Sequence, residues 1–415
     1  MNIMGIIFQK YSAWDILSAH WQIGMVALLS ALVATPIFRF IAYKTKIVDR
    51  PDDLLKPHKQ PTAYLGGLGI CTGLLAGLIT YLCTIPDSPD GSTYWQGLGD
   101  SLGQGDWLSL TRNPIWNLCA IMLACLLITV VGLADDIRDI KPKHKILGQL
   151  SAAALLLIGG VGTHMISVLT APVGVTLPEW VAIPLSAMGC IVLVVATCNA
   201  TNLLDGLDGL CGGVTAIISL GFLALAVWLA SWAKCPGMDE LRVALCLAMA
   251  GSILGFLPYN IPPASIFMGD AGSMLLGFFV ATMIALFGQG GSFRWFLAAC
   301  VVFGLPIIDT SLAVVRRLRM GVNIFAGDRS HLYDQLVDRG MTVKQVVAAF
   351  YAFALITASL AVGLAITIRT RYALIIYAAG FLSIWTVLWI LGMITPPARK
   401  PTSTKETETE TANHG

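Results

Sequence analysis

The chain has few charged residues for its length. Only 12% of its 415 residues are Asp, Glu, Lys or Arg, while 56% are hydrophobic. A soluble domain normally carries about 25% charged residues. The formal net charge is +2 and no long basic run is present, so we expect no nucleic-acid partner. This composition excludes an ordinary soluble domain and indicates an integral membrane protein.

Cysteine motifs and internal repeats are also missing. The ten cysteines are scattered, with no CxxC pair and no Cys/His spacing typical of a zinc site. Most lie in apolar segments, where free cysteine behaves as a small buried hydrophobe. No period of about 20–50 residues indicates a repeat array. We expect no cleavable signal peptide, because the first apolar run, near Ile23, is long enough to span a membrane.

Long apolar runs make up most of the chain. A membrane-spanning helix needs roughly 17–25 apolar residues, so we expect an all-α, polytopic transmembrane bundle of about eleven spans. Lys and Arg concentrate in alternate loops, which predicts an N-terminus outside and a cytoplasmic C-terminus. Residues 1–394 would form the membrane domain, and the polar residues 395–415 a disordered tail. The spans are expected to start near Ile23, Leu65, Ile115, Lys145, Trp180, Cys211, Leu241, Gly272, Trp295, Val343 and Ala373.

Adjacent carboxylates close the third expected span, at Asp135 and Asp136. Carboxylates at a membrane boundary repel each other and are costly to bring toward hydrocarbon. A divalent cation removes this penalty, and Mg²⁺ takes one or two carboxylates together with substrate phosphates. The alternative interpretation is a solvated helix end.

A second polar group recurs every three residues, at Asn199, Asn202, Asp205 and Asp208. On a helix such residues drift slowly along one side. The glycine after each aspartate suggests that a ligand or a neighbouring helix comes close. EF-hand calcium loops place their ligands on every second residue, so this spacing does not match them. A polar helix end without a ligand remains the alternative.

Asp270 follows Gly269 where the eighth span is expected to begin. The free N–H groups at the start of a helix favour anions, including phosphate. Asp270 is therefore either a metal ligand beside a phosphate or an N-terminal cap.

Two basic loops complete the expected cytoplasmic face. The first carries Lys59, and the second, from Arg316 to Lys344, carries Arg329 and His331. Arginine and histidine suit binding to phosphate, although ordinary inner loops are also basic. Asp309, inside the ninth span, is an intramembrane acid that needs a partner or a function.

Carboxylates, bases and asparagines on one side of a membrane favour a divalent metal that holds a diphosphate. Phosphoryl transfer needs mainly positioning and charge neutralisation, which these residues supply. The alternative class is an ion-coupled transporter, but its ionisable residues should lie near the bilayer midplane. The motifs lie at helix ends instead and favour an enzyme that acts on a lipid headgroup.

The order of these motifs, over roughly residues 40–345, resembles a known family. It is similar to that of the polyprenyl-phosphate N-acetylhexosamine-1-phosphate transferases, whose sister is phospho-N-acetylmuramoyl-pentapeptide transferase. The resemblance implies transfer of an N-acetylhexosamine 1-phosphate, foremost GlcNAc-1-phosphate, from a UDP-sugar to undecaprenyl phosphate, with release of UMP. It implies a bacterial inner-membrane enzyme with a cytoplasmic site and Mg²⁺, or Mn²⁺ in its place, and it allows a homodimer. The sister activity remains an alternative.

The resemblance also implies roles for individual residues. Asp270 would be the principal metal ligand with Asp205 beside it, and Asp208 would help to hold the uridine. The implied catalytic residues are Asp135, Asp136, Asp205 and His331, and the implied substrate-binding residues are Lys59, Asn199, Asn202, Asp208 and Arg329. One departure stands out, because the family commonly has His-x-His-His where this chain has His331-Leu332-Tyr333-Asp334.

Overall fold

The computed structural model describes residues 10–49, 61–85, 93–232, 237–289, 292–321 and 331–394. Its regular elements are almost entirely helical, which confirms the expected all-α architecture. The elements are α1 Ala13–Thr45, β1 Val48–Asp49, β2 Thr62–Ala63, α2 Gly66–Thr84, α3 Tyr94–Gln104, α4 Trp107–Arg112, α5 Pro114–Arg138, α6 Pro142–Ile158, α7 Met165–Thr170, the 3-10 turn η1 Ala171–Val173, α8 Glu179–Leu204, α9 Leu210–Ala230, α10 Met238–Asn260, α11 Gly269–Gln289, α12 Phe293–Val302, α13 Gly304–Met320, α14 Leu332–Asp338, α15 Val343–Thr367 and α16 Thr370–Ile390.

Nine helices of the described residues are long and apolar enough to cross a membrane, namely α1, α2, α5, α8, α9, α10, α11, α15 and α16. A tenth span forms if α12 and α13 are taken together, although they meet at a bend of 69°. The sequence predicts one continuous span here, and the structure divides it. The remaining expected span, near Lys145, is α6, whose 17 residues make it shorter than the other nine. The polytopic membrane architecture is thus confirmed.

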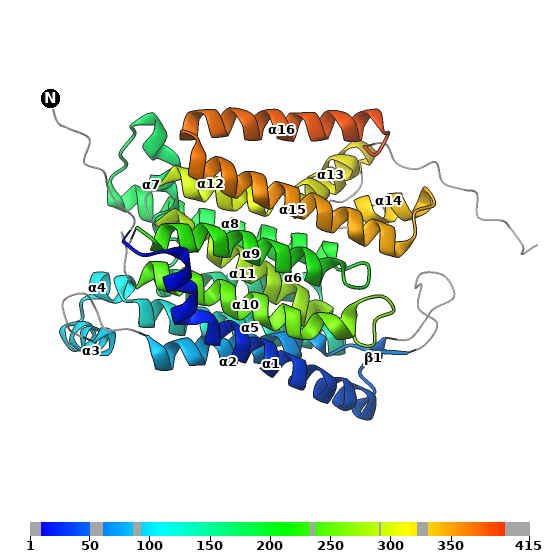
Figure 1. Ribbon diagram of the computed structural model, residues 1–415, viewed down its shortest axis with the longest axis horizontal. Coiled ribbons are helices and arrows are strands. Elements are labelled where there is room, and N and C mark those ends of the chain that lie inside the picture. The colour runs from blue at the N-terminus through cyan, green and yellow to red at the C-terminus, as the bar shows by residue number, and fades with distance from the viewer. Residues whose placement is uncertain are drawn as a thin grey trace, which may run out of the picture.

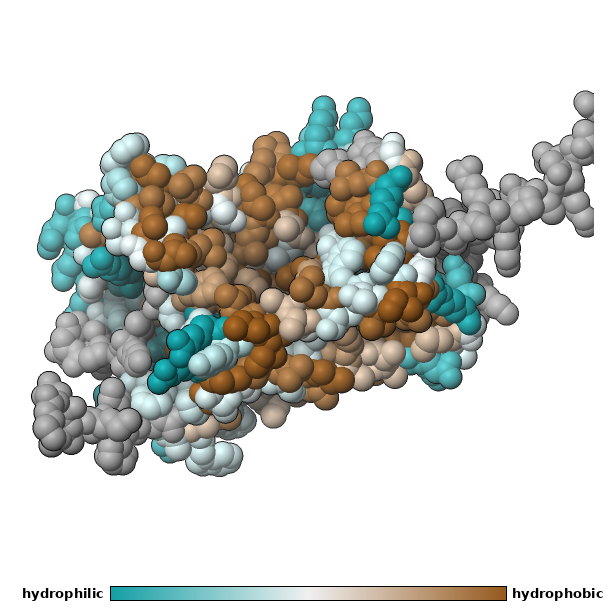
Figure 2. Space-filling model, turned by 90° about the horizontal axis from the view of Figure 1, so that it is seen from above, coloured by the Kyte–Doolittle hydropathy of each residue, from teal (hydrophilic) through white to brown (hydrophobic). Residues whose placement is uncertain are grey.

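The long helices run roughly side by side along the longest axis of the molecule (Figure 1). The short helices α3, α4 and α7 lie at one end of this bundle, while β1 and α14 lie at the other. On the face that carries α16, hydrophobic residues gather over the middle and most hydrophilic residues lie toward the two ends (Figure 2). An apolar band between polar ends is the surface expected of a protein that spans a bilayer.

Helix α11 forms the centre of the bundle. The apolar stretch of this helix is completely buried, and it packs against α2, α5, α8 and α12. Glycines allow the close approach of its neighbours: a side chain at Gly132 of α5 would meet the backbone of Ala271, and one at Gly277 would meet the backbone of Cys198. Small residues at helix contacts let membrane helices pack backbone against backbone. The start of α11 is therefore held tightly between α5 and α8.

This packing predicts the effect of adding one methyl group. We expect Gly132→Ala to lower the free energy of unfolding by about 1–3 kcal/mol, because the new Cβ must push α5 away from α11. Gly380→Ala on α16 is the matched control, because a Cβ there meets no atom within 4 Å. Thermal unfolding in detergent measures both variants. Equal melting temperatures for the two would contradict the tight α5–α11 contact.

Candidate active site

Four helix ends meet in an acidic cluster, which we define as Asp135, Lys145, Asn202 and Asp270. Lys145, in the first turn of α6, places its Nζ between the carboxylates of Asp135 and Asp270, 2.5 Å from Asp270 Oδ2. Asn202, near the end of α8, donates from Nδ2 to Asp270 Oδ1 at 2.8 Å. Asp135 lies near the end of α5 and Asp270 at the start of α11. Residues far apart in the sequence thus converge on one carboxylate.

Asp136 holds the start of α11 in place. Its carboxylate accepts the backbone N–H of Asp270 at 2.7 Å and that of Ala271 at 3.0 Å. Gly269 has φ of +66°, and a side chain there would meet the Asp136 carboxylate, so only glycine gives this approach without strain. From the sequence, we expect the free N–H groups at this helix start to bind an anion such as phosphate. That expectation is wrong for these two donors, because Asp136 already occupies them.

The loop before α2 is fastened to the same helix start. Gly66 and Gly67, the first residues of α2, donate their backbone N–H groups to the carbonyls of Phe267 and Met268, each at 2.9 Å. These two donors would otherwise remain unpaired at the beginning of a buried helix. The start of α2 and the segment that leads into α11 therefore form one unit at the same end of the bundle.

Tyr64 borders the cluster, although no feature of the sequence marks it. Its ring stands edge-on to that of Phe267, with centroids 6.2 Å apart. Burial raises the pKa of the Tyr64 hydroxyl, and the negative charges of Asp136 and Asp270 raise it further. The hydroxyl therefore stays protonated at neutral pH and can act as a neutral hydrogen-bond donor.

Asp205 lies among other acids, at the residue that follows α8. Burial raises its pKa well above the usual range, and the charges of Asp270 and Asp136 add to the shift. Among the described residues, no cation pairs with Asp205, because Lys145 bonds Asp135 and Asp270. The site thus carries more carboxylate charge than its described bases compensate.

The other members of the Asn/Asp motif point to different partners. Asn199 donates to Gln149 Oε1 of α6 at 3.1 Å, one turn before Asn202. Asp208 accepts the backbone N–H of Ala264 at 2.9 Å and ties the turn after α8 to the loop after α10. Neither side chain bonds to the acidic cluster. Their implied contacts with substrate stay predictions.

The donor atoms suit magnesium together with a phosphate ligand. Among the described residues, no three carboxylate, imidazole or thiol side chains come close enough to form a metal site alone. Mg²⁺ does not require this, because it binds through one or two carboxylates plus substrate phosphates and water. The carboxylates of Asp135 and Asp270 already converge on one cationic group, the Lys145 ammonium. Asp205 as a second metal ligand stays a prediction.

His331 is the residue before α14, and its neighbour Tyr333 connects this segment to the end of α8. His331 is buried, and its ring stacks on Tyr333 with centroids 5.6 Å apart and an interplanar angle of 8°. The Tyr333 hydroxyl donates to the Leu203 carbonyl at 3.2 Å, next to Asn202. Asp334 accepts the backbone N–H of His331 at 3.2 Å and so caps α14. Of the other expected ligands, Lys59 and Arg329 lie outside the described residues.

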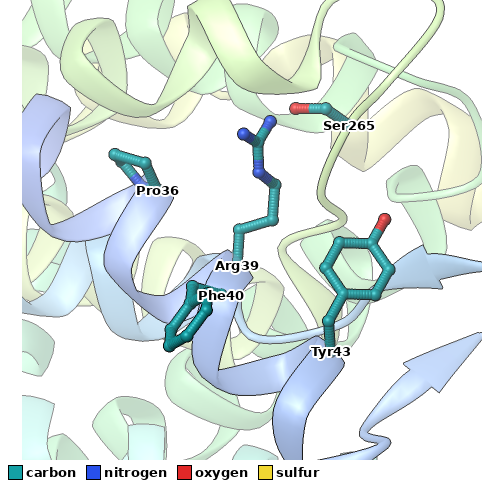
Figure 3. A pocket seen from close by; sticks show the side chains of 5 residues that line it. All are labelled: Pro36, Arg39, Phe40, Tyr43 and Ser265. Carbon is teal, nitrogen blue, oxygen red and sulfur yellow. The ribbon is translucent and has the colours of Figure 1, made fainter.

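A cavity of about 290 Å³ opens elsewhere on the surface, between α1 and the loop after α10 (Figure 3). Figure 3 shows the Arg39 guanidinium directed toward this loop. The hydroxyls of Tyr43 and Ser265 already donate to backbone carbonyls, at 3.3 and 3.0 Å. The cavity's described lining residues include no carboxylate and no member of the acidic cluster. It is lined by Pro36, Arg39, Phe40, Tyr43 and Ser265.

Comparison with known proteins decides the family. Residues 118–288, which include the whole acidic cluster, match the family described as glycosyl transferase family 4. A probable undecaprenyl-phosphate N-acetylglucosaminyl 1-phosphate transferase of Bacillus subtilis is 32% identical over 329 residues, which cover 79% of this chain and 80% of the relative. The chain belongs to glycosyl transferase family 4. The family resemblance drawn from the motifs is thereby confirmed.

Two further relatives of this family 4 transferase extend the comparison. A decaprenyl-phosphate N-acetylglucosaminephosphotransferase of Mycobacterium leprae is 29% identical and covers 79% of both chains. An undecaprenyl-phosphate alpha-N-acetylglucosaminyl 1-phosphate transferase of Escherichia coli K12 is 26% identical and covers 83% of both. These matches show that the chain is an enzyme of the transferase class.

Asp136 gives a stability prediction for this transferase. We expect Asp136→Asn to lower the free energy of unfolding by about 1–3 kcal/mol, because an amide NH₂ would face a backbone N–H in place of one acceptor oxygen. Asp139→Asn is the matched control at the exposed end of the same helix. Asp139 has φ of +47°, which asparagine tolerates well. Unfolding in detergent measures both, and equal loss in the two variants would show that Asp136 does not fasten α11.

Proposed function

We propose that this enzyme transfers GlcNAc-1-phosphate from UDP-GlcNAc to undecaprenyl phosphate, releases UMP and so begins a cell-envelope glycopolymer. The observation that carries the proposal is the acidic cluster itself, which gathers two carboxylates, an ammonium and a carboxamide at one end of a membrane-spanning bundle. The names of the relatives support both the sugar and the lipid acceptor. The sister activity on a muramoyl pentapeptide is not favoured, because none of these relatives is named for it.

The reaction replaces one diphosphate linkage by another. An oxygen of the lipid phosphate forms a bond to the β-phosphorus of UDP-GlcNAc while the bond from that phosphorus to the UMP oxygen breaks, so no external energy source is needed. A phosphate monoester is largely dianionic at neutral pH, because its second pKa is about 6. The nucleophile therefore needs no base, and the main tasks are to bring two anions together and to compensate their charge.

Lys145 is suited to the second task. Its ammonium lies between Asp135 and Asp270, and in this partly buried setting its attraction to a phosphate oxygen is stronger than in bulk water. Asp135 and Asp270 keep the ammonium at the cluster, and Asn202 orients the Asp270 carboxylate. Tyr64, which stays protonated, adds a donor that brings no charge.

The metal belongs to the proposal as well. Asp270, with Asp205 or Asp135 beside it, would hold Mg²⁺ or Mn²⁺, and the bound ion would compensate charge on the phosphate oxygens of the donor sugar nucleotide. Asp205 is suited to this role because it has no cationic partner among the described residues, and because burial, together with its acidic neighbours, makes an unpaired charge there costly and raises its pKa.

A product assay tests the activity. Purified enzyme is incubated with undecaprenyl phosphate, Mg²⁺ and a panel of UDP-sugars, and the lipid product is identified by mass. We expect a GlcNAc-diphospholipid, no product in excess chelator, and loss of activity in Asp270→Asn. Asp100→Asn, on the exposed side of α3 at the far end of the bundle, should keep the parent rate.

Three results would count against this proposal. Full turnover in excess chelator would exclude the metal. A lipid product from another sugar nucleotide alone would exclude GlcNAc as the donor sugar. Uptake of substrate into sealed vesicles without any lipid-linked product would favour the transporter that the sequence left as an alternative.

We further propose that the acidic cluster faces the cytoplasm of the bacterial inner membrane. The cluster lies at the bundle end to which the basic-rich loops of the sequence lead, and basic loops stay inside. A reporter fused after Gly415 tests this sidedness. An enzyme reporter active only in the cytoplasm should be active there, and one active only in the periplasm should be silent. The reverse pattern would place the cluster on the outer face.

A further inference from the structure

Asp309 and His331 form a buried pair. The two side chains are 1% and 3% exposed, and His331 Nδ1 lies 3.0 Å from Asp309 Oδ2. The second carboxylate oxygen, Oδ1, accepts the backbone N–H of Leu332 at 2.7 Å. The Asp309 carboxylate thus bonds both the imidazole ring of His331 and the backbone N–H of the next residue. The intramembrane acid noted in the sequence has its partner.

The ring of His331 is fixed on a second side. Tyr333 stacks almost parallel to it, and the Tyr333 hydroxyl is anchored on the Leu203 carbonyl at the end of α8. A side chain on Gly206 would collide with the Tyr333 hydroxyl, so the turn between Leu204 and Asp208 lies directly against this phenol. The imidazole plane is therefore set relative to the turn that carries Asp205.

The other ring nitrogen of His331, Nε2, makes no hydrogen bond within the part of the chain that the structure describes. This nitrogen is also buried. An unpaired polar atom in a buried site costs roughly 1–3 kcal/mol, and such atoms in native proteins call for an explanation, of which a catalytic role is one. Because Asp309 accepts from Nδ1–H, the hydrogen on that nitrogen leaves Nε2 as the edge available to a ligand.

We propose that Asp309 is a positioning residue for catalysis, which holds His331 so that Nε2, in the imidazolium form, donates to a phosphate oxygen of the sugar-nucleotide diphosphate. This inference rests on the proposed function and deepens it, because it assigns the role of the single histidine in the last loop. The contact involves no proton transfer and no new bond to the protein. A carboxylate behind a histidine fixes the ring orientation and the tautomer, as it does in many catalytic and metal-binding histidines.

The competing explanation is that Asp309 only caps α14. In that case the Leu332 N–H bond is the one that counts, and the ring contact is incidental. Asn at position 309 separates the two explanations, because its amide oxygen can still accept from Leu332 N–H. Its NH₂ group would meet Nδ1–H of His331, and the ring would have to adopt the other tautomer or rotate away from its stacked position.

The experiment is a kinetic double-mutant cycle on the full-length enzyme in detergent. Asp309→Asn, His331→Ala and the double variant are assayed with undecaprenyl phosphate, Mg²⁺ and UDP-GlcNAc. Ser311→Ala serves as the control, because in the part of the chain that the structure describes its hydroxyl donates within the same helix, to the Ile308 carbonyl at 2.9 Å. We expect Asp309→Asn to lower kcat about 10- to 100-fold with a smaller change in KM, and to lower it by less than about twofold in the His331→Ala background. Ser311→Ala should keep the parent rate.

Several outcomes would overturn the inference. The first is a kcat of Asp309→Asn equal to that of the parent enzyme. The second is an equal fold-decrease in kcat from Asp309→Asn in the parent and in the His331→Ala background. If Asp309→Asn does not fold, ¹⁵N NMR of the histidines in the parent decides, with the His331 signals assigned by their loss in His331→Ala. Hydrogen on both ring nitrogens in the presence of UDP-GlcNAc supports the inference, and a neutral ring under that condition, with hydrogen on one nitrogen only, overturns it. A parent enzyme that forms no lipid product from any UDP-N-acetylhexosamine would instead show that the proposed function is wrong.

Discussion

The start of α11 can be buried in the bundle only if its charge and its free N–H groups are both compensated. Asp136 accepts two of the N–H groups, while Lys145 and Asn202 bond the Asp270 carboxylate. Each of these partners comes from a different helix. The need to pair one buried helix start therefore fixes the relative positions of the ends of α5, α6 and α8. The same contacts that hold the fold also gather the charged groups of the site.

Much of this arrangement could be predicted from the sequence. Hydropathy and motif spacing are local properties, which can be read from a short stretch of residues without knowledge of the packing. The spans and the polar motifs at their ends follow from apolar length and from the cost of charge near hydrocarbon, while the central role of Asp270 was implied by the family resemblance. The sequence could not predict which side chain of a helix faces the site, because this depends on the rotation of the helix in the packed bundle. Three lysines follow the acidic pair, at 141, 143 and 145, and only the packing of α6 selects Lys145. The bend between α12 and α13 does have a sequence signal, because the ring of Pro306 clashes with the carbonyl four residues earlier, at Val302, where α12 ends.

Packing also separates residues that the sequence treats as equals. Asp135 and Asp136 are adjacent, yet one bonds a lysine and the other two backbone N–H groups. Asn199 and Asn202 are one turn apart, yet only Asn202 bonds Asp270, because Asn199 points toward α6. A three-residue period advances around a helix by less than a full turn. Its members therefore cannot all face one ligand, and the structure shows which of them do.

The segment that begins at His331 shows what the residues that depart from the family pattern contact in this chain. Where the family commonly has two further histidines, this chain has Tyr333 and Asp334, and both have structural partners here. Asp334 caps α14, and Tyr333 stacks on His331 while it contacts the end of α8. An imidazole at either place would bring a titratable ring, whereas these residues use a neutral phenol and a helix cap. His331 is then the one histidine of this motif, and the Asp309 carboxylate lies against its Nδ1. The departure from the family pattern therefore replaces two titratable rings by residues that bond to the protein itself.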